Sequence, residues 1–428
     1  MVRASGRTDS MSRSAELVFV CGSGGLAAFG VLLVNLAREE IRAMPALAAF
    51  LVLSVAFGLL LVAMRAWAPD ATPLLIPTAS VLAAVGFITI YRLDENLASL
   101  HGWWLLLSAT MSVLWLYAVS EKGLGHRGGG WWPLLALAAG LVVVPSLGAD
   151  GGTIWLAWSS GPAVVLNNGE IVKLVMVVLF AVLLSERQAF FSAGGRYTAP
   201  LHPARVTTSW QSVLLLGLVV IIVAIRDSGT AMIVVGMFCV MAYMATNRSA
   251  YLVGGFGAGV IWLVAGPWLS EGLQTRIAVW TDPWTQPEGP GNRLAEGLFG
   301  LAAGSLSGTG FGLGEPDLIP EATTSLAFAA VGEELGLAGT VVVLAAYALM
   351  VVTGFGIALR AGEVFHKLLA GGLSLLLGGQ TALSVAGAVG LLPGTAAPIP
   401  FLSYGVSLTM AGFLILAVLA RVSHEERV

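Results

Sequence analysis

Long apolar runs, separated by short polar or Gly/Pro-rich breaks, repeat along the whole chain. Each run approaches the roughly 20 residues that a helix needs to cross a bilayer. The runs are continuous and lack the alternation of transmembrane β-strands. The pattern predicts an all-α polytopic membrane protein with about twelve spans. The expected spans are residues 15–37, 45–67, 72–91, 103–119, 131–147, 163–184, 211–225, 229–247, 250–269, 326–356, 365–389 and 399–421.

Composition supports this class. The 428 residues are 57% hydrophobic and 11% charged, whereas a soluble domain carries about 25% charged residues. The sequence contains no phosphate-binding P-loop, nucleophile elbow or zinc motif, which argues against a nucleotide-driven pump. The five histidines are scattered without ligand spacing, so we expect solvated loop histidines and no metal site. No nucleic-acid partner is expected.

The distribution of positive charge predicts the orientation. Fourteen of the 21 lysines and arginines fall on the side of the termini and six on the other side. By the positive-inside rule, both termini, including the tail 1–14, should lie in the cytoplasm. The longest segment between spans, residues 270–325, should then be extracytoplasmic, partly helical and folded back towards the membrane. Any chemistry should face the same side.

Ionisable residues at membrane depth are costly and therefore informative. Glu170 and Lys173 are spaced i, i+3 and share a helix face. They predict either an ion pair that fixes helix packing or a polar cavity for a charged headgroup. Asp227 interrupts an apolar stretch, where it either caps the following helix or serves a site.

Two further stretches carry polar groups at helix entries. Glu333 and Glu334 project about 100° apart on a helix, so at most one can face lipid and the other should find a donor inside the bundle. In PIPFLSYGVS, the prolines and glycine suggest exposed backbone, and Ser403 and Tyr404 offer hydroxyl groups. Charged residues within the spans are also compatible with a secondary transporter, which stays an alternative function.

Five stretches in one order resemble the SEDS family (shape, elongation, division and sporulation) of RodA/FtsW type. They are NNGEIVK, RDSGTA, WTDPW with the Gly-rich loop after it, PDLIPEATTSLAFAAVGEELGLAG and GLLPGTAAPIPFLSYGVS. The amino-acid sequence of these stretches is most similar to the actinobacterial RodA-like branch of the family. The resemblance covers about residues 72–428 and implies a ten-helix core there. The two helices within residues 15–71 would be an addition to that core.

The resemblance implies an activity and partners. Members of the family polymerise lipid II, the undecaprenyl-linked precursor of peptidoglycan, and work with a class B penicillin-binding protein. An acceptor sugar hydroxyl attacks the donor's anomeric carbon, and a lipid diphosphate leaves. This reaction needs a base for the hydroxyl and cationic help for the diphosphate. The resemblance also suggests a divalent cation, Mg²⁺ or Mn²⁺, as an aid.

Site residues follow from the resemblance position by position. Those expected to bind substrate are the acid and lysine of the central cavity, a second membrane acid, an acid after the loop and the Ser-Tyr-Gly hydroxyls: Glu170, Lys173, Asp227, Glu334, Ser403 and Tyr404. Apart from the resemblance, two arginines of the loop, Arg276 and Arg293, are also expected to bind substrate.

The catalytic position departs from the family. Where the family reads Pro-Glu-Ala-His-Thr-Asp-Phe, the aspartate being its catalytic residue, this chain has Ser325. A serine hydroxyl has no useful basicity at neutral pH. Glu321 is the best candidate for a replacement base, followed by Asp317. Elsewhere, Arg293 stands in a motif that usually reads Gly-Tyr-Gln, and Val406 replaces a glycine.

Three hypotheses follow. The first is a glycosyltransferase that polymerises lipid II through a nearby acid. The second is a catalytically lapsed homologue that binds a lipid-linked precursor or a penicillin-binding protein as a scaffold. The third is a transporter of a lipid-linked precursor.

Overall fold

The computed structural model describes residues 6–40, 42–120, 153–156, 164–186, 228–269, 271–285, 289–393 and 397–426. Helices dominate these residues, and one short pair of strands accompanies them. The chain divides into two compact units, which are described separately. The first unit holds Met1–Gly125, Ala278–Ile357 and Leu377–Val428, and the second holds His126–Ile277 and Ala358–Leu376.

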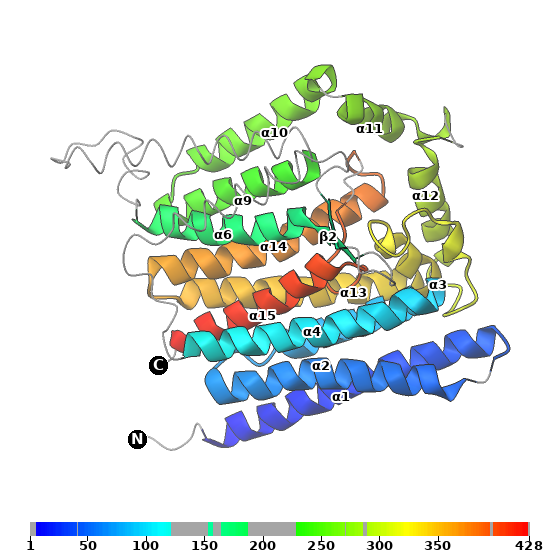
Figure 1. Ribbon diagram of the computed structural model, residues 1–428. Helices are drawn as coiled ribbons and strands as arrows, with labels where there is room; N and C mark the ends of the chain where they lie inside the picture. The colour runs from blue at the N-terminus through cyan, green and yellow to red at the C-terminus, as the bar shows by residue number, and fades with distance from the viewer. Residues whose placement is uncertain are drawn as a thin grey trace. The chain divides into compact units, whose positions relative to one another are not determined.

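Five long helices form a bundle in the first unit (Figure 1). They are α1 (Gly6–Ala37), α2 (Ala43–Trp67), α3 (Leu75–Leu93), α4 (Glu95–Ser120) and α15 (Val406–Glu425). α1 and α2 form a helical hairpin. α1 packs against α3, while α2 and α15 both pack against α4. Apolar side chains fill the bundle, as shown by the fully buried rings of Phe57 and Phe413, 4.9 Å apart.

Local chemistry sets two helix starts that differ from the expected spans. α4 begins well before residue 103 because the Asp94 carboxylate accepts the backbone N–H groups of Asn96 and Leu97, at 2.8 and 3.1 Å. α15 begins at Val406, later than the expected residue 399. Pro398 and Pro400 offer no N–H, and the positive φ of Phe401, +69°, interrupts a helix there.

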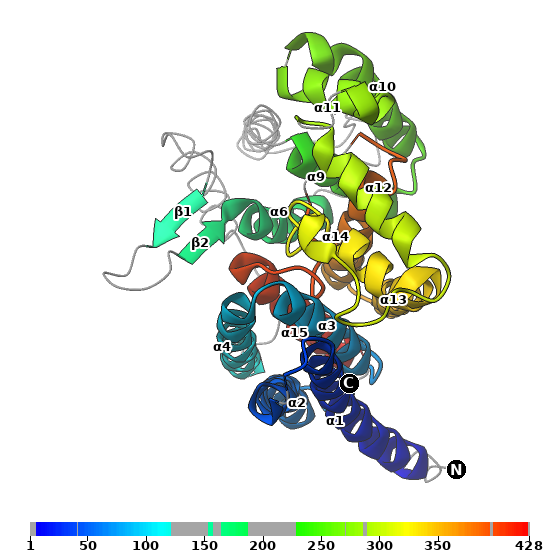
Figure 2. The same ribbon diagram turned by 90° about the vertical axis from the view of Figure 1, so that its right-hand side faces the viewer.

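The first unit also includes residues 278–357, which contain shorter helices and most of one further long helix. It contains η1 (Pro283–Thr285), α12 (Asn292–Gly304), η2 (Pro316–Leu318) and most of α13 (Ala327–Arg360). With α11 (Glu271–Thr281), these elements confirm that residues 270–325 are partly helical. α13 is broken at Gly336, whose φ and ψ are 65° and −170°. Figure 2 shows the chain between α12 and α13 folded beside the first turns of α13.

The second unit contains α6 (Asn168–Glu186), α9 (Ser228–Thr246), α10 (Ala250–Leu269) and the first half of α14 (Val364–Ala388). α9 packs against both α6 and α10. Two strands, β1 (Thr153–Leu156) and β2 (Val164–Asn167), pair antiparallel directly before α6 (Figure 2). The expected span 163–184 is therefore wrong at its start, because β2 takes up its first residues.

Eight described helices are long and apolar enough to cross a membrane: Ser14–Ala37, Ala43–Trp67, Leu75–Leu93, Glu95–Ser120, Gly229–Thr246, Ala327–Arg360, Val364–Ala388 and Val406–Glu425. Each matches an expected span. α10 has a shorter apolar part, Ala250–Val264. The expected spans 131–147 and 211–225 lie outside the described residues, as does Asp227.

The expectation of solvated histidines is wrong at two positions. His101 is 1% exposed and His366 is 6% exposed. His101 lies in α4 ahead of the expected span 103–119, and His366 lies in the first turn of α14, inside the expected span 365–389. The His101 ring packs between those of Phe87 and Tyr404, with ring centroids 6.4 and 5.9 Å away.

Candidate functional site

Ser325 lies in the turn that leads into α13 and is 4% exposed. Arg293, in the first turn of α12, donates a hydrogen bond from Nη2 to Ser325 Oγ at 2.8 Å. Ser325 Oγ in turn donates to Glu321 Oε2. Arg293 Nη2 also lies 3.4 Å from the same Glu321 oxygen. The three residues therefore form one cluster, with the hydroxyl between a guanidinium and a carboxylate.

Glu321 occupies a constrained backbone position. Its φ is +56°, in the left-handed region that few non-glycine residues enter. Its carbonyl accepts the N–H groups of Thr324, at 2.9 Å, and Leu326, at 3.2 Å, which closes the turn. Such a conformation costs about 1–3 kcal/mol and is concentrated at functional sites. The Glu321 side chain is 49% exposed, so its carboxylate is open to a ligand.

Ser403 and Tyr404 support this turn from the segment before α15. Ser403 Oγ donates to the Thr324 carbonyl at 2.5 Å, and Tyr404 N–H donates to the Thr323 carbonyl at 2.7 Å. Ser403 Oγ also accepts the N–H of Ile399 at 3.0 Å. The Ser403 hydroxyl is thus engaged with backbone groups on both sides and fixes the chain immediately before Ser325.

The Tyr404 hydroxyl remains a proton donor at neutral pH. Burial raises its pKa, and the nearby Asp94 carboxylate adds to this, whereas a hydrogen bond with Trp104 opposes it. Tyr404 joins the Ser325 turn through its backbone. Its ring packs against His101 in α4.

Two buried carboxylates hold the chain between α12 and α13 onto the break in α13. Glu333 Oε1 accepts the N–H of Glu315 at 2.6 Å, and Glu334 Oε1 accepts the N–H of Gly312 at 2.9 Å. The two side chains belong to residues 5% and 2% exposed. The folded-back chain thus supplies a donor to each carboxylate, which agrees with the expectation that at most one of them faces lipid.

Arg92, at the end of α3, was not predicted to be a site residue. Its Nη2 donates to the Gly314 carbonyl at 2.8 Å, and its Nε lies 3.3 Å from Glu334 Oε1. The same guanidinium is 4.0 Å from the carboxylate of Asp317, which is 63% exposed. Asp317 thus pairs with Arg92, while Glu321 pairs with Arg293. The signal for Arg92 was a charge placed directly at the end of an apolar run.

The second unit contains the other candidates that can be placed. Lys173 Nζ donates to Glu170 Oε1 at 2.7 Å, and the two side chains are 3% and 5% exposed. The predicted i, i+3 ion pair is confirmed. Arg276 lies on α11 and is half-buried. Binding of substrate by these three residues stays a prediction.

The described residues give no support for a metal centre held by side chains. Among them, no group of three or more His, Cys, Asp or Glu side chains could hold a metal ion. Glu321 already faces the Arg293 guanidinium, which would compete with a cation. The divalent cation that the family resemblance suggests stays a prediction.

Comparison with known proteins gives a match to one family model and to relatives named peptidoglycan glycosyltransferases. A family model described as "Cell cycle protein", for FtsW, RodA and SpoVE, matches residues 72–428. "Peptidoglycan glycosyltransferase RodA" of Mycobacterium tuberculosis (strain ATCC 25618 / H37Rv) is 31% identical over 442 residues, which cover 97% of this chain and 91% of that protein. "Probable peptidoglycan glycosyltransferase FtsW" of Geobacter metallireducens is 30% identical over 66% of this chain and 73% of its own length.

Solved structures share the fold. A chain from a structure described as "Structural coordination of polymerization and crosslinking by a peptidoglycan synthase complex" has a TM-score of 0.63 and 23% identity. The match covers 83% of this chain and 98% of that one. Rod shape determining protein RodA of Thermus thermophilus has a TM-score of 0.53 and 22% identity, over 83% of this chain and 97% of its own. With the eight apolar helices, these similarities identify an integral membrane protein.

Proposed function

Because the chain belongs to the family of FtsW, RodA and SpoVE, we propose that it is a peptidoglycan glycosyltransferase that polymerises lipid II at the extracytoplasmic face. Its Mycobacterium and Geobacter relatives carry the name of that activity. The observation that carries the proposal is the cluster of Arg293, Ser325 and Glu321, which places a carboxylate beside the position where the family has its aspartate.

Glu321 is the proposed general base. Its carboxylate takes the proton of the acceptor sugar hydroxyl, while the hydroxyl oxygen forms a bond to the donor's anomeric carbon. The bond between that carbon and the diphosphate oxygen breaks, and the lipid diphosphate leaves with the electron pair. Glu321 Oε2 is held by Ser325 and Arg293, which leaves the other carboxylate oxygen for the acceptor hydroxyl.

Arg293 has two proposed roles. It orients Glu321 by contacts to both Ser325 Oγ and Glu321 Oε2. Its side chain is 32% exposed, so its positive charge can stabilise the negative charge that develops on the leaving diphosphate.

The partner and the orientation belong to the same proposal. We infer a class B penicillin-binding protein as partner, since polymerised strands need crosslinking, and the solved synthase complex is described by both steps. Both termini are assigned to the cytoplasm from the excess of lysine and arginine on their side.

The test is a polymerisation assay with purified protein, labelled lipid II, and the cognate penicillin-binding protein present or absent. Glu321→Gln should lower the rate by about 10²–10⁴-fold, because it removes the proton acceptor and keeps the side-chain shape. Asp317→Asn is the matched control and should retain most of the rate, since Asp317 pairs with Arg92. Adding a chelator tests the need for a divalent cation.

The other outcomes discriminate the alternatives. Full activity in Glu321→Gln would remove Glu321 from the mechanism. No polymer from the unmodified protein, with polymer after Ser325→Asp, would indicate a lapsed enzyme. Movement of labelled precursor across vesicles without polymer would indicate a transporter.

A further inference from the structure

The hairpin of α1 and α2 precedes the residues that match the family model, 72–428. The Mycobacterium tuberculosis relative nevertheless covers 97% of this chain, so its alignment includes residues ahead of 72. The hairpin packs on α3 and α4, and its turn lies near the end of α3. Two sets of contacts connect this turn with residues 305–318, here called the outer loop.

The first set of contacts is steric. Gly312 of the outer loop has a φ of +82°, and a Cβ added there would lie 2.8 Å from the Ala37 Cβ and 3.1 Å from the Val34 Cα. The last turn of α1 therefore lies directly against the backbone of the outer loop. Glycine is required at 312 both for the left-handed backbone and for this approach.

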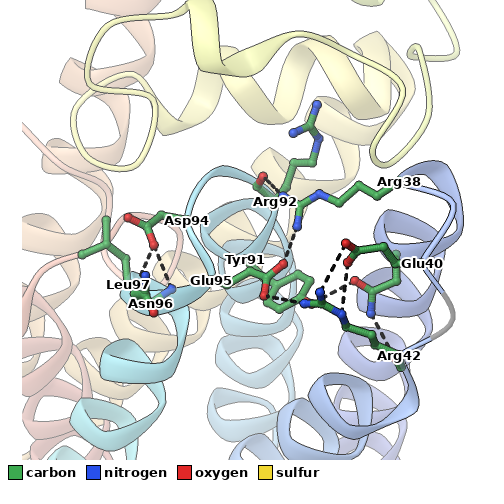
Figure 3. A network of polar contacts seen from close by, with 10 residues as sticks. Arg38, Glu40, Arg42, Tyr91, Arg92, Asp94, Glu95, Asn96 and Leu97 are labelled. Carbon is green, nitrogen blue, oxygen red and sulfur yellow. Dashed lines mark hydrogen bonds and ion pairs between the residues drawn. The ribbon is translucent and has the colours of Figure 1, made fainter.

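The second set of contacts is polar and begins at Arg38 (Figure 3). Its Nη2 donates to the carbonyl of Arg92 at 2.8 Å, and its Nη1 donates to Glu95 Oε1 at 2.6 Å. The guanidinium also lies 5.9 Å from the centre of the Tyr91 ring. The Tyr91 hydroxyl donates to the buried Asn35 Oδ1 at 2.9 Å, which returns the network to α1.

Arg92 continues the connection to the outer loop. Its backbone carbonyl is held by Arg38, while its side chain is bonded to the Gly314 carbonyl and lies beside Glu334. Glu334 also accepts the N–H of Gly312. The Arg92 side chain is only 16% exposed, so these interactions are largely shielded from water.

We propose that the α1–α2 hairpin is a brace for the outer loop, and that Arg38 is the positioning residue that joins them through Arg92. The hairpin fixes where α3 ends, Arg92 fixes Gly314 and Glu334, and the loop continues through η2 to Glu321. An effect on polymerisation rests on the proposed function. The order of the outer loop itself is measurable without it.

Hydrogen–deuterium exchange on the full-length protein in nanodiscs tests the brace. The informative amides belong to Thr309, Gly310, Gly312 and Glu315, whose acceptors are groups of Glu333 and Glu334. In Arg38→Ala, peptides covering residues 305–318 should exchange about tenfold faster, because a charged hydrogen bond that supports their frame is lost. Peptides from α15 should be unchanged, which separates local loosening from unfolding.

Arg42→Ala is the matched control, an arginine of the same turn. Its side chain is 54% exposed and pairs with Glu40 and Glu95 at 3.2 and 3.6 Å, so solvent weakens these contacts. In Arg42→Ala, the exchange rate of peptides covering residues 305–318 should change by less than about twofold. Arg38→Lys keeps one donor and should restore part of the protection. Glu95→Gln provides a milder variant for the case that Arg38→Ala does not fold.

Unchanged exchange of 305–318 in both Arg38→Ala and Glu95→Gln would overturn the brace, whether or not the unmodified protein polymerises lipid II. Equal acceleration in Arg42→Ala would also overturn the assigned role of Arg38. Absence of polymer from the unmodified protein, with accelerated exchange in Arg38→Ala, would instead reject the proposed function and leave the brace in place.

Discussion

The Ser325 hydroxyl lies between the Arg293 guanidinium and the Glu321 carboxylate. In this position it can orient the carboxylate, although a serine hydroxyl is too weak a base to serve as the general base itself. It donates a hydrogen bond to Glu321 and accepts a hydrogen bond from Arg293. Ser325 is 4% exposed and its oxygen already accepts a hydrogen bond from Arg293, so it is not placed to attack a substrate as a nucleophile. Its contribution is to orient the carboxylate.

Ser325→Ala should therefore be much milder than Glu321→Gln. Arg293 Nη2 already lies 3.4 Å from Glu321 Oε2, so the pair can close directly when the hydroxyl is removed. We expect a loss of about tenfold in kcat, the equivalent of one modest hydrogen bond, in the polymerisation assay described above.

The matched control for Ser325→Ala is Thr324→Ala. The exposed Thr324 hydroxyl makes only a 3.4 Å contact with the Glu321 carbonyl, so its rate should stay close to that of the unmodified protein. A loss in Ser325→Ala as large as that in Glu321→Gln would show that the hydroxyl itself takes part in the chemistry.

Sequence spacing predicts part of this cluster. Glu321 and Ser325 are four residues apart, and their proximity follows from the turn between them. Arg293 is 32 residues from Ser325, and its contact depends on how α12 folds back against the start of α13. The link from Arg92 to Gly314 spans 222 residues and has no local signal at all.

At the scale of elements, the break in α13 organises the site. Gly336 has a φ of +65°, and the carbonyls of Glu333 and Glu334 next to it accept the N–H groups of Thr309 and Gly310, at 3.0 and 2.9 Å. The outer loop thus takes hydrogen bonds that an unbroken helix would have kept for itself.

Gly336→Ala should lower the free energy of unfolding by about 1–3 kcal/mol, since a side chain is strained at this φ. An added Cβ would also lie 2.7 Å from the Leu306 carbonyl oxygen. Thermal unfolding in detergent measures the change.

Gly356→Ala, in the same helix, is the control. A Cβ there meets no atom within 4 Å, so alanine should be neutral or stabilising by about 0.5–1 kcal/mol. Equal melting temperatures for the two variants would mean that the break tolerates a side chain.

The hydrophobic pattern predicts helices well where an apolar run is long enough to cross a membrane. The eight apolar helices all correspond to expected spans, because a continuous apolar run of this length has one stable form in lipid. The β1–β2 pair was not predicted, since strands of four residues show no periodicity that distinguishes them from the end of an apolar run. Helix starts also differed, as at Asp94, where a polar cap extends α4 into a polar segment.

On the scale of the whole molecule, the assignment of sides rests on charge counting and can be tested directly. With Cys21 and Cys239 replaced by serine, one cysteine is introduced at Gly289 or at Glu363, both exposed in the structure. In intact cells, a membrane-impermeant maleimide should label Gly289→Cys and not Glu363→Cys, because the first lies in the segment assigned to the outside.

Permeabilised cells supply the control for this experiment, since both cysteines should then react. The reverse pattern in intact cells would place the termini and the Arg293–Ser325–Glu321 cluster on the opposite sides from those proposed, and would exclude polymerisation at the extracytoplasmic face.

The bonds from Ser403 and Tyr404 to the carbonyls of Thr324 and Thr323 have a consequence for how this region tolerates change. Both acceptors are main-chain atoms, which every amino acid possesses. Residues with many different side chains at 323 and 324 would therefore keep these two hydrogen bonds. Inserting or deleting one residue between Glu321 and Ser325 would instead move a different carbonyl into each position. The length of this turn is constrained far more tightly than its composition.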